Sequence, residues 1–260
     1  MGFLEDVVEA TEAEVGRRRK AVPDAELRAR FGPEQRGFPF SEALVAPGVS
    51  LVAEVKRASP SRGLIRPGAS VTEIVRAYEA AGAGACSILT EPAFFGGSLD
   101  DLVEARAACG LPLLRKDFIV DEYQLLEARA AGADAVLLIV AALEDDRLSE
   151  LLQAATDLRL EALVEVHDED ETQIAVEAGA EIIGVNNRDL RTLEVDPETA
   201  LRLLPDIPAG TVVIAESGIA TAEDVRRMGE AGVDAVLVGE ALMRAPDPGE
   251  AVRALLAGAA

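Results

Sequence analysis

Lysine is almost absent from this chain of 260 residues, in which Lys20, Lys56 and Lys116 are the only lysines among 25 basic residues. Arginine stays protonated near neutral pH, whereas a desolvated lysine can release a proton from its compact ammonium group. Lys20 lies in a basic cluster typical of a surface, but Lys56 and Lys116 end apolar, strand-like runs. GC-rich codon bias that left three lysines by chance would also explain the scarcity. The residues around Lys56 and Lys116 therefore decide whether these lysines have a chemical role.

Several other features are missing or scarce. Aromatic residues make up 3% of the chain and tryptophan is absent, so the hydrophobic 49% predicts an aliphatic core. No apolar run is long enough to span a bilayer, and the acidic N-terminus lacks the basic start and apolar middle of a signal peptide. Cys86 and Cys109 lack the spacing of a metal or redox motif. We therefore expect a cytoplasmic protein, in a reducing compartment, with no membrane partner.

Positive charge is also in deficit, because the formal net charge at pH 7 is −22. This charge argues against nucleic acid and anionic membranes as partners. The composition fits a high-salt cytosol, while a GC-rich genome would lower lysine as well, and the sequence does not separate the two. In either case an anionic substrate needs a local positive site within a repelling overall field.

A repeated pattern of helix, glycine and buried strand runs through the chain. Segments rich in alanine and glycine at 80–85, 131–135, 177–181 and 230–235 each precede a short aliphatic run. Glycine just past a helix adopts the left-handed conformation without a Cβ penalty, and continuous aliphatic runs indicate parallel strands covered on both faces. Eight strands are predicted, near residues 50–56, 86–90, 112–116, 135–140, 161–166, 182–186, 211–215 and 235–239.

Helical patterns separate these strands. They are predicted near residues 71–82, 99–109, 121–132, 144–157, 170–179, 197–204, 222–231 and 248–258. Eight βα units in roughly 210 residues are the signature of an α/β fold of the (β/α)8 TIM barrel type. A doubly wound sheet is the alternative, although it rarely needs eight evenly spaced units.

Residues 1–260 are expected to form a single barrel domain, of which 1–47 is an N-terminal helical extension. One helical stripe of this extension is apolar and comprises Phe3, Leu4, Val7, Val8, Thr11 and Val15. A second helix is predicted from Asp24 to Phe31, behind Pro23. The extension either covers apolar surface passively or closes one rim of the site.

Ionisable and amide side chains gather at the predicted strand ends, where barrel enzymes place their chemistry. They are Glu54 and Lys56 on the first strand, Lys116 on the third, Glu165 on the fifth, Asn186 to Asp189 after the sixth, and Glu216 after the seventh. Any one of them alone would fit a solvated ion pair at the rim. Together they favour a catalytic site, because desolvating so many polar groups is costly without a task.

Glycines after the last two strands suggest a phosphate site. Ser217 and Gly218 follow the seventh strand, and Gly239 follows the eighth, just before a short predicted helix at 241–244. In barrels this pairing often forms a cradle of backbone N–H groups, which Ser59 and Arg188 could complete. Glycines after strands are common in any case, so the local signal is moderate.

Taken together, these segments resemble the indole-3-glycerol phosphate synthase family of tryptophan biosynthesis. The resemblance spans about residues 3–255, and its motifs are Glu54–Gly63, Leu89–Ser98, Leu114–Ile119, Glu165–His167, Gly184–Leu190, Ala215–Ile219 and Leu237–Arg244. It implies ring closure of 1-(2-carboxyphenylamino)-1-deoxyribulose 5-phosphate with loss of carbon dioxide and water. It further implies a small phosphorylated molecule as substrate, no cofactor and no metal, and a monomer.

The resemblance also implies roles for individual residues. Lys116 matches the general acid, Glu165 the acid–base carboxylate, and Lys56, with Glu54 beside it, the lysine that holds the substrate carboxylate or donates a proton. The division of roles between the two lysines is left open. The remaining matches are Asn186, Glu216 and Ser217 around the substrate, Ser59, Arg188, Gly218 and Gly239 at the phosphate, and Phe95, Phe118, Leu137 and Leu190 around the aryl ring.

Two competing functions remain from the residues alone. Another phosphate-binding barrel, such as a phosphosugar isomerase or a Schiff-base aldolase, would use the same scaffold, and borohydride trapping would reveal a covalent lysine. A catalytically silent barrel is disfavoured by the presence of Glu54, Lys56, Lys116 and Glu165. His167, which shares a strand face with Glu165, is assigned no role.

Overall fold

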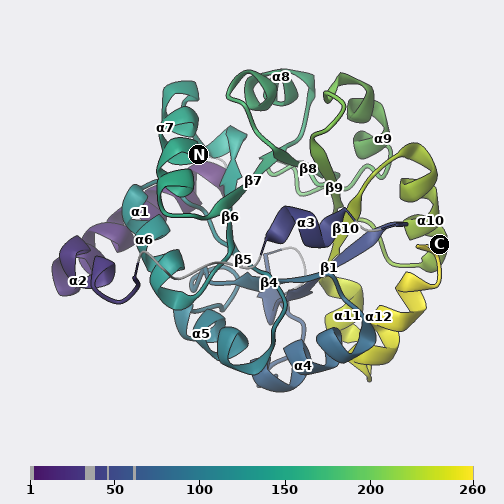
Figure 1. The fold of residues 1–260 in the computed structure, drawn as a ribbon, viewed down its shortest axis with the longest axis horizontal. Helices are drawn as coiled ribbons and strands as arrows, with labels where there is room; N and C mark the ends of the chain where they lie inside the picture. Colours follow the sequence, from purple (N-terminus) through teal and green to yellow (C-terminus); the bar gives the residue numbers. More distant parts are fainter. Residues whose placement is uncertain (1–2, 33–38, 46, 61–62, 260) are drawn as a thin grey trace.

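Eight parallel strands close into a barrel in the computed structural model, which describes residues 3–32, 39–45, 47–60 and 63–259 (Figure 1). The strands are β1 (Ser50–Val55), β4 (Ala85–Leu89), β5 (Leu113–Lys116), β6 (Ala135–Ile139), β7 (Glu161–Val166), β8 (Ile182–Asn186), β9 (Val212–Glu216) and β10 (Ala235–Val238). Each pairs in parallel with its neighbours in chain order, and β10 closes the ring on β1. The predicted (β/α)8 barrel is confirmed.

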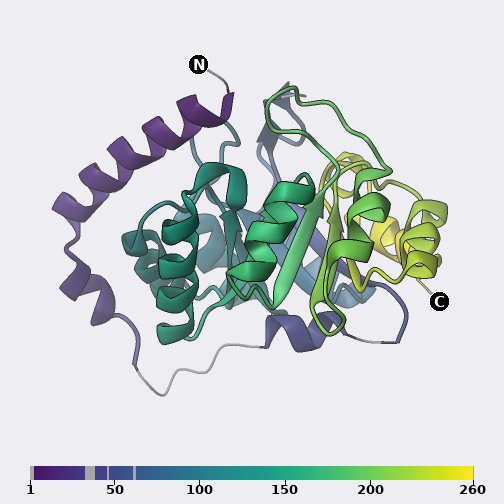
Figure 2. The same ribbon diagram turned by 90° about the horizontal axis from the view of Figure 1, so that it is seen from above.

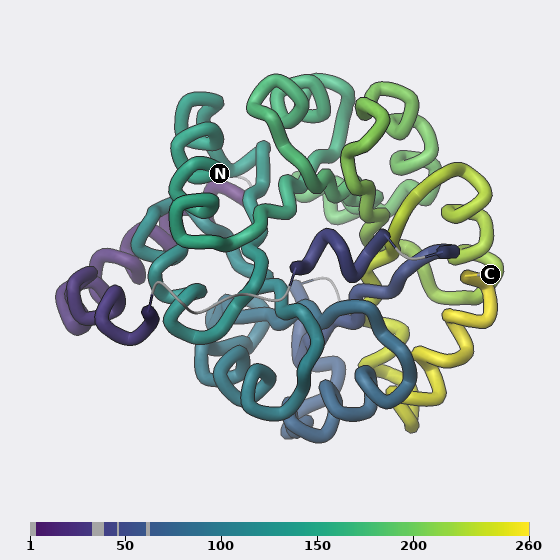
Figure 3. Tube along the Cα trace, viewed as in Figure 1, coloured from purple at the N-terminus to yellow at the C-terminus, as the bar shows by residue number. Residues whose placement is uncertain are grey.

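Helices cover the outside of the barrel, and the Cα trace follows strand and helix in turn around it (Figure 3). They are α4 (Val71–Ala81), α5 (Leu99–Ala108), α6 (Glu122–Ala131), α7 (Asp145–Asp157), α8 (Glu169–Glu177), α9 (Thr199–Leu203), α10 (Ala222–Ala231), α11 (Glu240–Arg244) and α12 (Pro248–Leu256). Two short 3-10 turns, Val140–Ala142 and Leu204–Asp206, adjoin them. None of the described helices is both long enough and apolar enough to cross a membrane.

The helix–glycine–strand repeat has the expected physical basis. Gly82, Gly132 and Gly232 cap α4, α6 and α10 with φ values of 95°, 91° and 101°, and Gly179 follows α8 with a φ of 81°. These are left-handed conformations that favour glycine. Each glycine thereby turns the chain back toward the barrel, where the next aliphatic strand is buried from both sides.

The N-terminal extension reaches from one end of the barrel to the other (Figure 2). It comprises α1 (Phe3–Ala21), α2 (Asp24–Arg28) and α3 (Phe40–Leu44). Within the predicted apolar stripe, Val7, Thr11 and Val15 are buried, whereas the side chain of Phe3 lies outside the described part.

Two features of the extension differ from the prediction. The second helix ends at Arg28 rather than Phe31, and α3 was not predicted. Phe40 and Leu44 of α3 are fully buried in the same apolar cluster as the barrel interior. The carboxylate of Glu161, at the amino end of β7, accepts the backbone N–H groups of Phe40 and Ser41. A helix of five residues gives little periodicity, so these tertiary contacts are what stabilise it.

A buried charge network ties the extension to the strand that carries Lys116. The guanidinium of Arg18 on α1 lies 2.7 Å from Glu127 on α6. Glu127 also lies 3.3 Å from Arg115 on β5, which pairs with Asp117 at 2.8 Å. Arg115 is almost fully buried, so its partners are needed to offset its desolvation.

A small antiparallel hairpin follows β1 directly and was not predicted. Its strands, β2 (Ala58–Ser59) and β3 (Gly63–Leu64), have two residues each. This hairpin brings Ser59 to the carboxyl end of the barrel, beside Lys56.

Candidate active site

A cavity of about 530 Å³ opens at the carboxyl ends of the strands. Every residue predicted for the site lines it, namely Glu54, Lys56, Ser59, Phe95, Lys116, Phe118, Leu137, Glu165, Asn186, Arg188, Leu190, Glu216, Ser217, Gly218 and Gly239. They come from all eight strands of the barrel and the loops that follow them. The barrel therefore brings together groups up to 185 positions apart in the chain, from Glu54 to Gly239.

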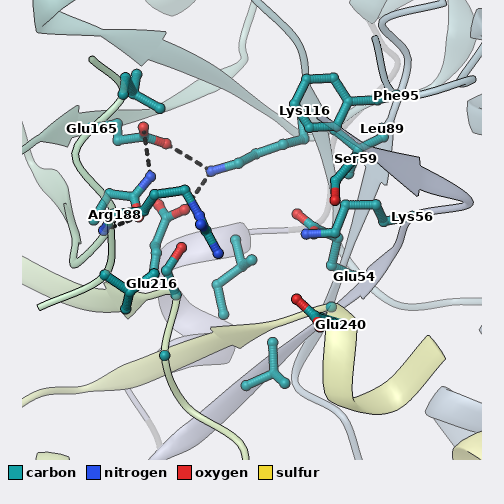
Figure 4. A pocket seen from close by; sticks show the side chains of 18 of the residues that line it. Glu54, Lys56, Ser59, Leu89, Phe95, Lys116, Glu165, Arg188, Glu216 and Glu240 are labelled. Atoms are coloured by element: carbon teal, nitrogen blue, oxygen red, sulfur yellow. Dashed lines mark hydrogen bonds and ion pairs between the residues drawn. The ribbon is translucent and has the colours of Figure 1, made fainter. Parts of the chain in front are cut away.

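Lys116 lies at the centre of an ionic cluster (Figure 4). Its Nζ lies 2.9 Å from Oε2 of Glu165 and also pairs with Oε2 of Glu216. Burial alone would lower the pKa of Lys116, but Glu165, Glu216 and, more weakly, Glu54 outweigh it and raise the pKa. The premise that burial would let this lysine release a proton near neutral pH is therefore reversed, because two carboxylates hold the ammonium charged.

The two carboxylates beside Lys116 have opposite tendencies. Burial favours the neutral form of Glu165, but the charge of Lys116 and the contacts with His167 and Asn186 prevail and lower its pKa. For Glu216, burial, reinforced by the charge of Glu165, outweighs the attraction of Lys116 and raises the pKa to about 7. One carboxylate thus remains ionised while the other exchanges a proton near neutral pH, which is the pattern of an acid–base site.

Glycine at position 184 makes room for Glu216. A Cβ atom on Gly184 of β8 would overlap Oε1 of Glu216 and touch Leu163. Among the described atoms, Oε1 of Glu216 is buried without a hydrogen-bond partner. The lack of a partner favours the neutral form of the Glu216 carboxyl group, because a buried charge without a hydrogen bond is costly.

A second ion pair lies across the cavity from the first, as Figure 4 shows. Lys56 Nζ is 2.8 Å from Oε1 of Glu54, and Oε2 of Glu54 accepts a hydrogen bond from Ser87 at 3.4 Å. A Cβ atom on Gly239 would overlap Oε1 of Glu54, so a larger residue there would displace the carboxylate of Glu54. The two lysines therefore present separate positive centres to one cavity.

The structure separates the adjacent Asn186 and Asn187. Asn186 lines the cavity and its Nδ2 donates to Oε1 of Glu165 at 3.0 Å. Asn187 points away, donating to the carbonyl of Ser217 at 2.9 Å and accepting from the N–H of Ala200 at 2.9 Å. Asn186 is thus placed to contact a substrate, whereas Asn187 holds neighbouring loops.

The apolar wall is formed by Phe95, Phe118, Leu137 and Leu190. The two phenylalanine rings lie 6.2 Å apart with a tilt of 41°. Glu91 positions Phe95, because its carboxylate accepts the N–H group of Phe95 at 3.1 Å. An apolar surface that contains two phenyl rings is suited to pack an aromatic ring.

The remaining rim is polar and built from backbone turns. Ser217 and Gly218 have consecutive positive φ values of 64° and 77°. Arg188 lines the same part of the cavity and donates from its guanidinium to the carbonyl of Leu193 at 2.7 Å. Gly239 lies directly before α11, as predicted.

Two functional candidates were missed from the sequence. Arg244 lines the cavity and pairs at 3.2 Å with Glu240, which also lines it. His167 lies behind Glu165 and contacts it directly. Its position two residues after Glu165 and four before Glu171 was a usable signal. Within the described residues, no cluster of His, Cys, Asp and Glu could hold a metal ion.

Comparison with known proteins agrees with this arrangement. The family model described as indole-3-glycerol phosphate synthase matches residues 4–255. The chain is 50% identical over 255 residues to indole-3-glycerol phosphate synthase 2 of Streptomyces coelicolor, covering 98% of this chain and 99% of the relative. It is 49% identical over 253 residues to the indole-3-glycerol phosphate synthase of Mycolicibacterium gilvum, covering 97% and 93%.

Among solved structures, the chain resembles 3-hexulose-6-phosphate synthase from Salmonella typhimurium, with a TM-score of 0.65 and 17% identity over 81% of this chain and 98% of the other. It also resembles a tryptophan synthase alpha-subunit from Pyrococcus furiosus, with a TM-score of 0.62 and 16% identity over 80% and 98%. At these identities the likeness shows the barrel fold alone.

Proposed function

The chain belongs to the indole-3-glycerol phosphate synthase family, and we propose that the ionic cluster around Lys116 performs the acid–base steps of that family's reaction. The family is a group of carboxy-lyases in tryptophan biosynthesis. They close the second ring of 1-(2-carboxyphenylamino)-1-deoxyribulose 5-phosphate. Carbon dioxide and water leave, and indole-3-glycerol phosphate remains.

Lys116 is the proton donor in the ring-closing step. As the aryl carbon attacks the ketone carbon, negative charge develops on the ketone oxygen and must be neutralised. A developing alkoxide is a stronger base than an amine, so a lysine with a raised pKa still donates to it. The observation that carries this role is the burial of Lys116 between Glu165 and Glu216. Their carboxylates keep the ammonium of Lys116 charged until the ketone oxygen becomes basic enough to take the proton.

Glu165 is the acid–base carboxylate of the later steps. After carbon dioxide has left, the hydroxyl group takes a proton from Lys56, which no longer holds the substrate carboxylate, and departs as water. A ring proton must then be removed to restore aromaticity. The low pKa of Glu165 keeps it available as a base, and Asn186 fixes its orientation. Glu216, with a pKa of about 7, and Ser217 complete the polar lining near the reacting atoms.

The rest of the cavity supports a matching division of binding roles. Lys56, steadied by Glu54, takes the carboxylate of the substrate. The phosphate lies at the rim made by Ser59, Arg188, Gly218 and Gly239. The aryl ring packs on Phe95, Phe118, Leu137 and Leu190. This places the two anionic groups of the substrate beside separate cations, within a chain whose overall charge is strongly negative.

The protein is further proposed to act as a cytoplasmic monomer. In support of a monomer, the residues proposed for binding and catalysis all come from one chain. In support of a cytoplasmic location, both cysteines are free and buried, as in a reducing compartment. Light scattering at working concentration should give the mass of one chain, and a stable larger particle would contradict this part of the proposal.

Incubation with the carboxyphenylamino-deoxyribulose phosphate tests the residue roles, with indole fluorescence reporting product. Glu165→Gln retains the shape of the side chain but cannot accept a proton, so kcat should fall by about 10²–10⁴-fold. Glu169→Gln, an exposed change on α8, is the matched control and should leave kcat unchanged. Wild-type turnover by Glu165→Gln would contradict the role of Glu165.

A further inference from the structure

His167, the only histidine of the chain, lies just beyond β7 and behind Glu165. It is not among the residues that line the cavity, and only 7% of its side chain is exposed. Nδ1 of its ring lies 2.8 Å from Oε2 of Glu171, and Nε2 lies 3.2 Å from Oε1 of Glu165, close enough for an ion pair but not aligned as a hydrogen bond. The ring is therefore enclosed between one carboxylate of the active site and one carboxylate outside it.

This geometry favours a charged ring. A neutral imidazole carries a proton on one nitrogen and a lone pair on the other. With a carboxylate oxygen beside each nitrogen, the neutral form would turn a lone pair toward an anion. Only the imidazolium is protonated at both nitrogens and so places positive charge beside both Glu165 and Glu171, the ionisable groups that face the ring from β7 and α8.

Glu171 is itself held firmly. It is the third residue of α8, and its backbone N–H donates to the capping carboxylate of Asp168 at 3.0 Å. Its own carboxylate accepts the backbone N–H of His167 at 2.8 Å as well as the ring contact. The first turn of α8 therefore fixes both the main chain and the ring of His167.

We propose that His167 is a positioning residue: an imidazolium, clamped by Glu171, that holds Oε1 of Glu165 so that Oε2 faces Lys116 and the substrate. This inference rests on the acid–base role proposed for Glu165. Burial by itself would lower the pKa of His167, but its contacts with Glu165 and Glu171 outweigh burial and raise the pKa to about 10. The ring thus remains charged throughout the neutral range.

The fixed charge matters most after Lys116 has given up its proton. At that moment Glu165 loses the cation at Oε2, and a carboxylate in a buried site would tend to capture a proton. The imidazolium at Oε1 keeps Glu165 ionised, so that it remains available to take the ring proton in the final step. His167 contacts no reacting atom and acts through Glu165 alone.

The single histidine makes the charge directly measurable. In untagged protein labelled with ¹⁵N-histidine, the two ring nitrogens give the only imidazole signals, without need of assignment. Both should be protonated at pH 8, with a titration midpoint near 10 rather than near the ordinary value of 6.5. Glu171→Gln preserves the shape but removes the charge, and should lower the midpoint by about 1 to 3 pH units. Glu169→Gln, on the exposed side of the same turn, should leave it unchanged.

The kinetic test separates charge from packing. His167→Gln should lower kcat by about 10- to 100-fold, as for a misplaced catalytic group, while KM changes far less. His167→Arg restores a cation and should recover part of the lost kcat, which a purely structural role would not predict. Wild-type protein with one unprotonated ring nitrogen at pH 8, or His167→Gln with undiminished kcat, would overturn the inference. If the variants do not fold, the wild-type titration still decides.

Different results would contradict the proposed function and the role of His167. If Glu165→Gln stays fully active, the proposed function is wrong and the role of His167 falls with it. If Glu165→Gln is inactive but the histidine of the wild-type protein titrates near 6.5, only the inference about His167 is wrong.

Discussion

Replacing Glu216 by glutamine should make the stability of the protein less sensitive to pH. Glu216 is buried, and its pKa rises from 4.5 to about 7 in the folded state, because burial and the charge of Glu165 outweigh Lys116. A raised carboxyl pKa contributes stability that is fully present below pH 4.5 and is lost as the pH rises through 7. The difference between the two pKa values corresponds to about 3 kcal/mol, most of which is lost between pH 5 and pH 8.

The assay is thermal unfolding of both proteins at several pH values in this range. Glutamine cannot ionise, so the variant does not lose this stability as the pH rises. The free energy of unfolding of Glu216→Gln, relative to that of the wild-type protein, should therefore increase by about 2 kcal/mol from pH 5 to pH 8. For a domain of this size that corresponds to a relative rise in Tm of roughly 4–8 °C. Comparing the two pH values removes any effect of the substitution that does not depend on pH. Glu223→Gln, an exposed surface change, is the control. Parallel Tm curves for wild type and Glu216→Gln would refute the reasoning.

Three further outcomes are expected. Gly239→Ala introduces no backbone strain at a φ of −121°, but its methyl group displaces Glu54, so KM should rise by about tenfold or more while the protein still folds, and an unchanged KM would contradict the close approach. Arg18→Ala removes a partner of buried Glu127 and should lower the free energy of unfolding by about 1–3 kcal/mol in thermal unfolding. Arg17→Ala, the control, breaks an exposed pair and should change it by no more than about 0.5 kcal/mol. Equal losses would show that the pair of Arg18 with Glu127 does not anchor the extension. Activity should survive EDTA, and recovery by a divalent ion after loss would contradict acid–base chemistry by side chains alone.

The barrel could be predicted because its elements carry local signals. Glycines such as Gly82 and Gly132 mark helix ends, and the strands they precede are continuously aliphatic since both faces are buried. In a parallel barrel all strand ends meet at one rim, so Lys116 and Glu165 could be expected to approach each other from sequence alone.

Other features depend on tertiary contacts and carry no such signal. The five residues of α3 are stabilised beneath the barrel by burial of Phe40 and by the carboxylate of Glu161. The direction in which the pKa of Lys116 shifts could not be predicted, because it depends on how closely Glu165 and Glu216 approach its ammonium. Burial is visible in a sequence pattern, but the distance to an opposite charge is not.

The central claim, that Lys116 donates the proton during ring closure, is tested most directly by Lys116→Arg with the carboxyphenylamino-deoxyribulose phosphate as substrate. Arginine keeps the positive charge between Glu165 and Glu216 but retains its proton, so kcat should fall by about 10²–10⁴-fold with a much smaller change in KM. Lys20→Arg, the same change at an exposed position, should leave both constants unaltered. A Lys116→Arg variant that keeps more than about a tenth of the wild-type kcat would contradict the claim, and would make Lys116 an electrostatic anchor and Lys56 the better candidate for the acid.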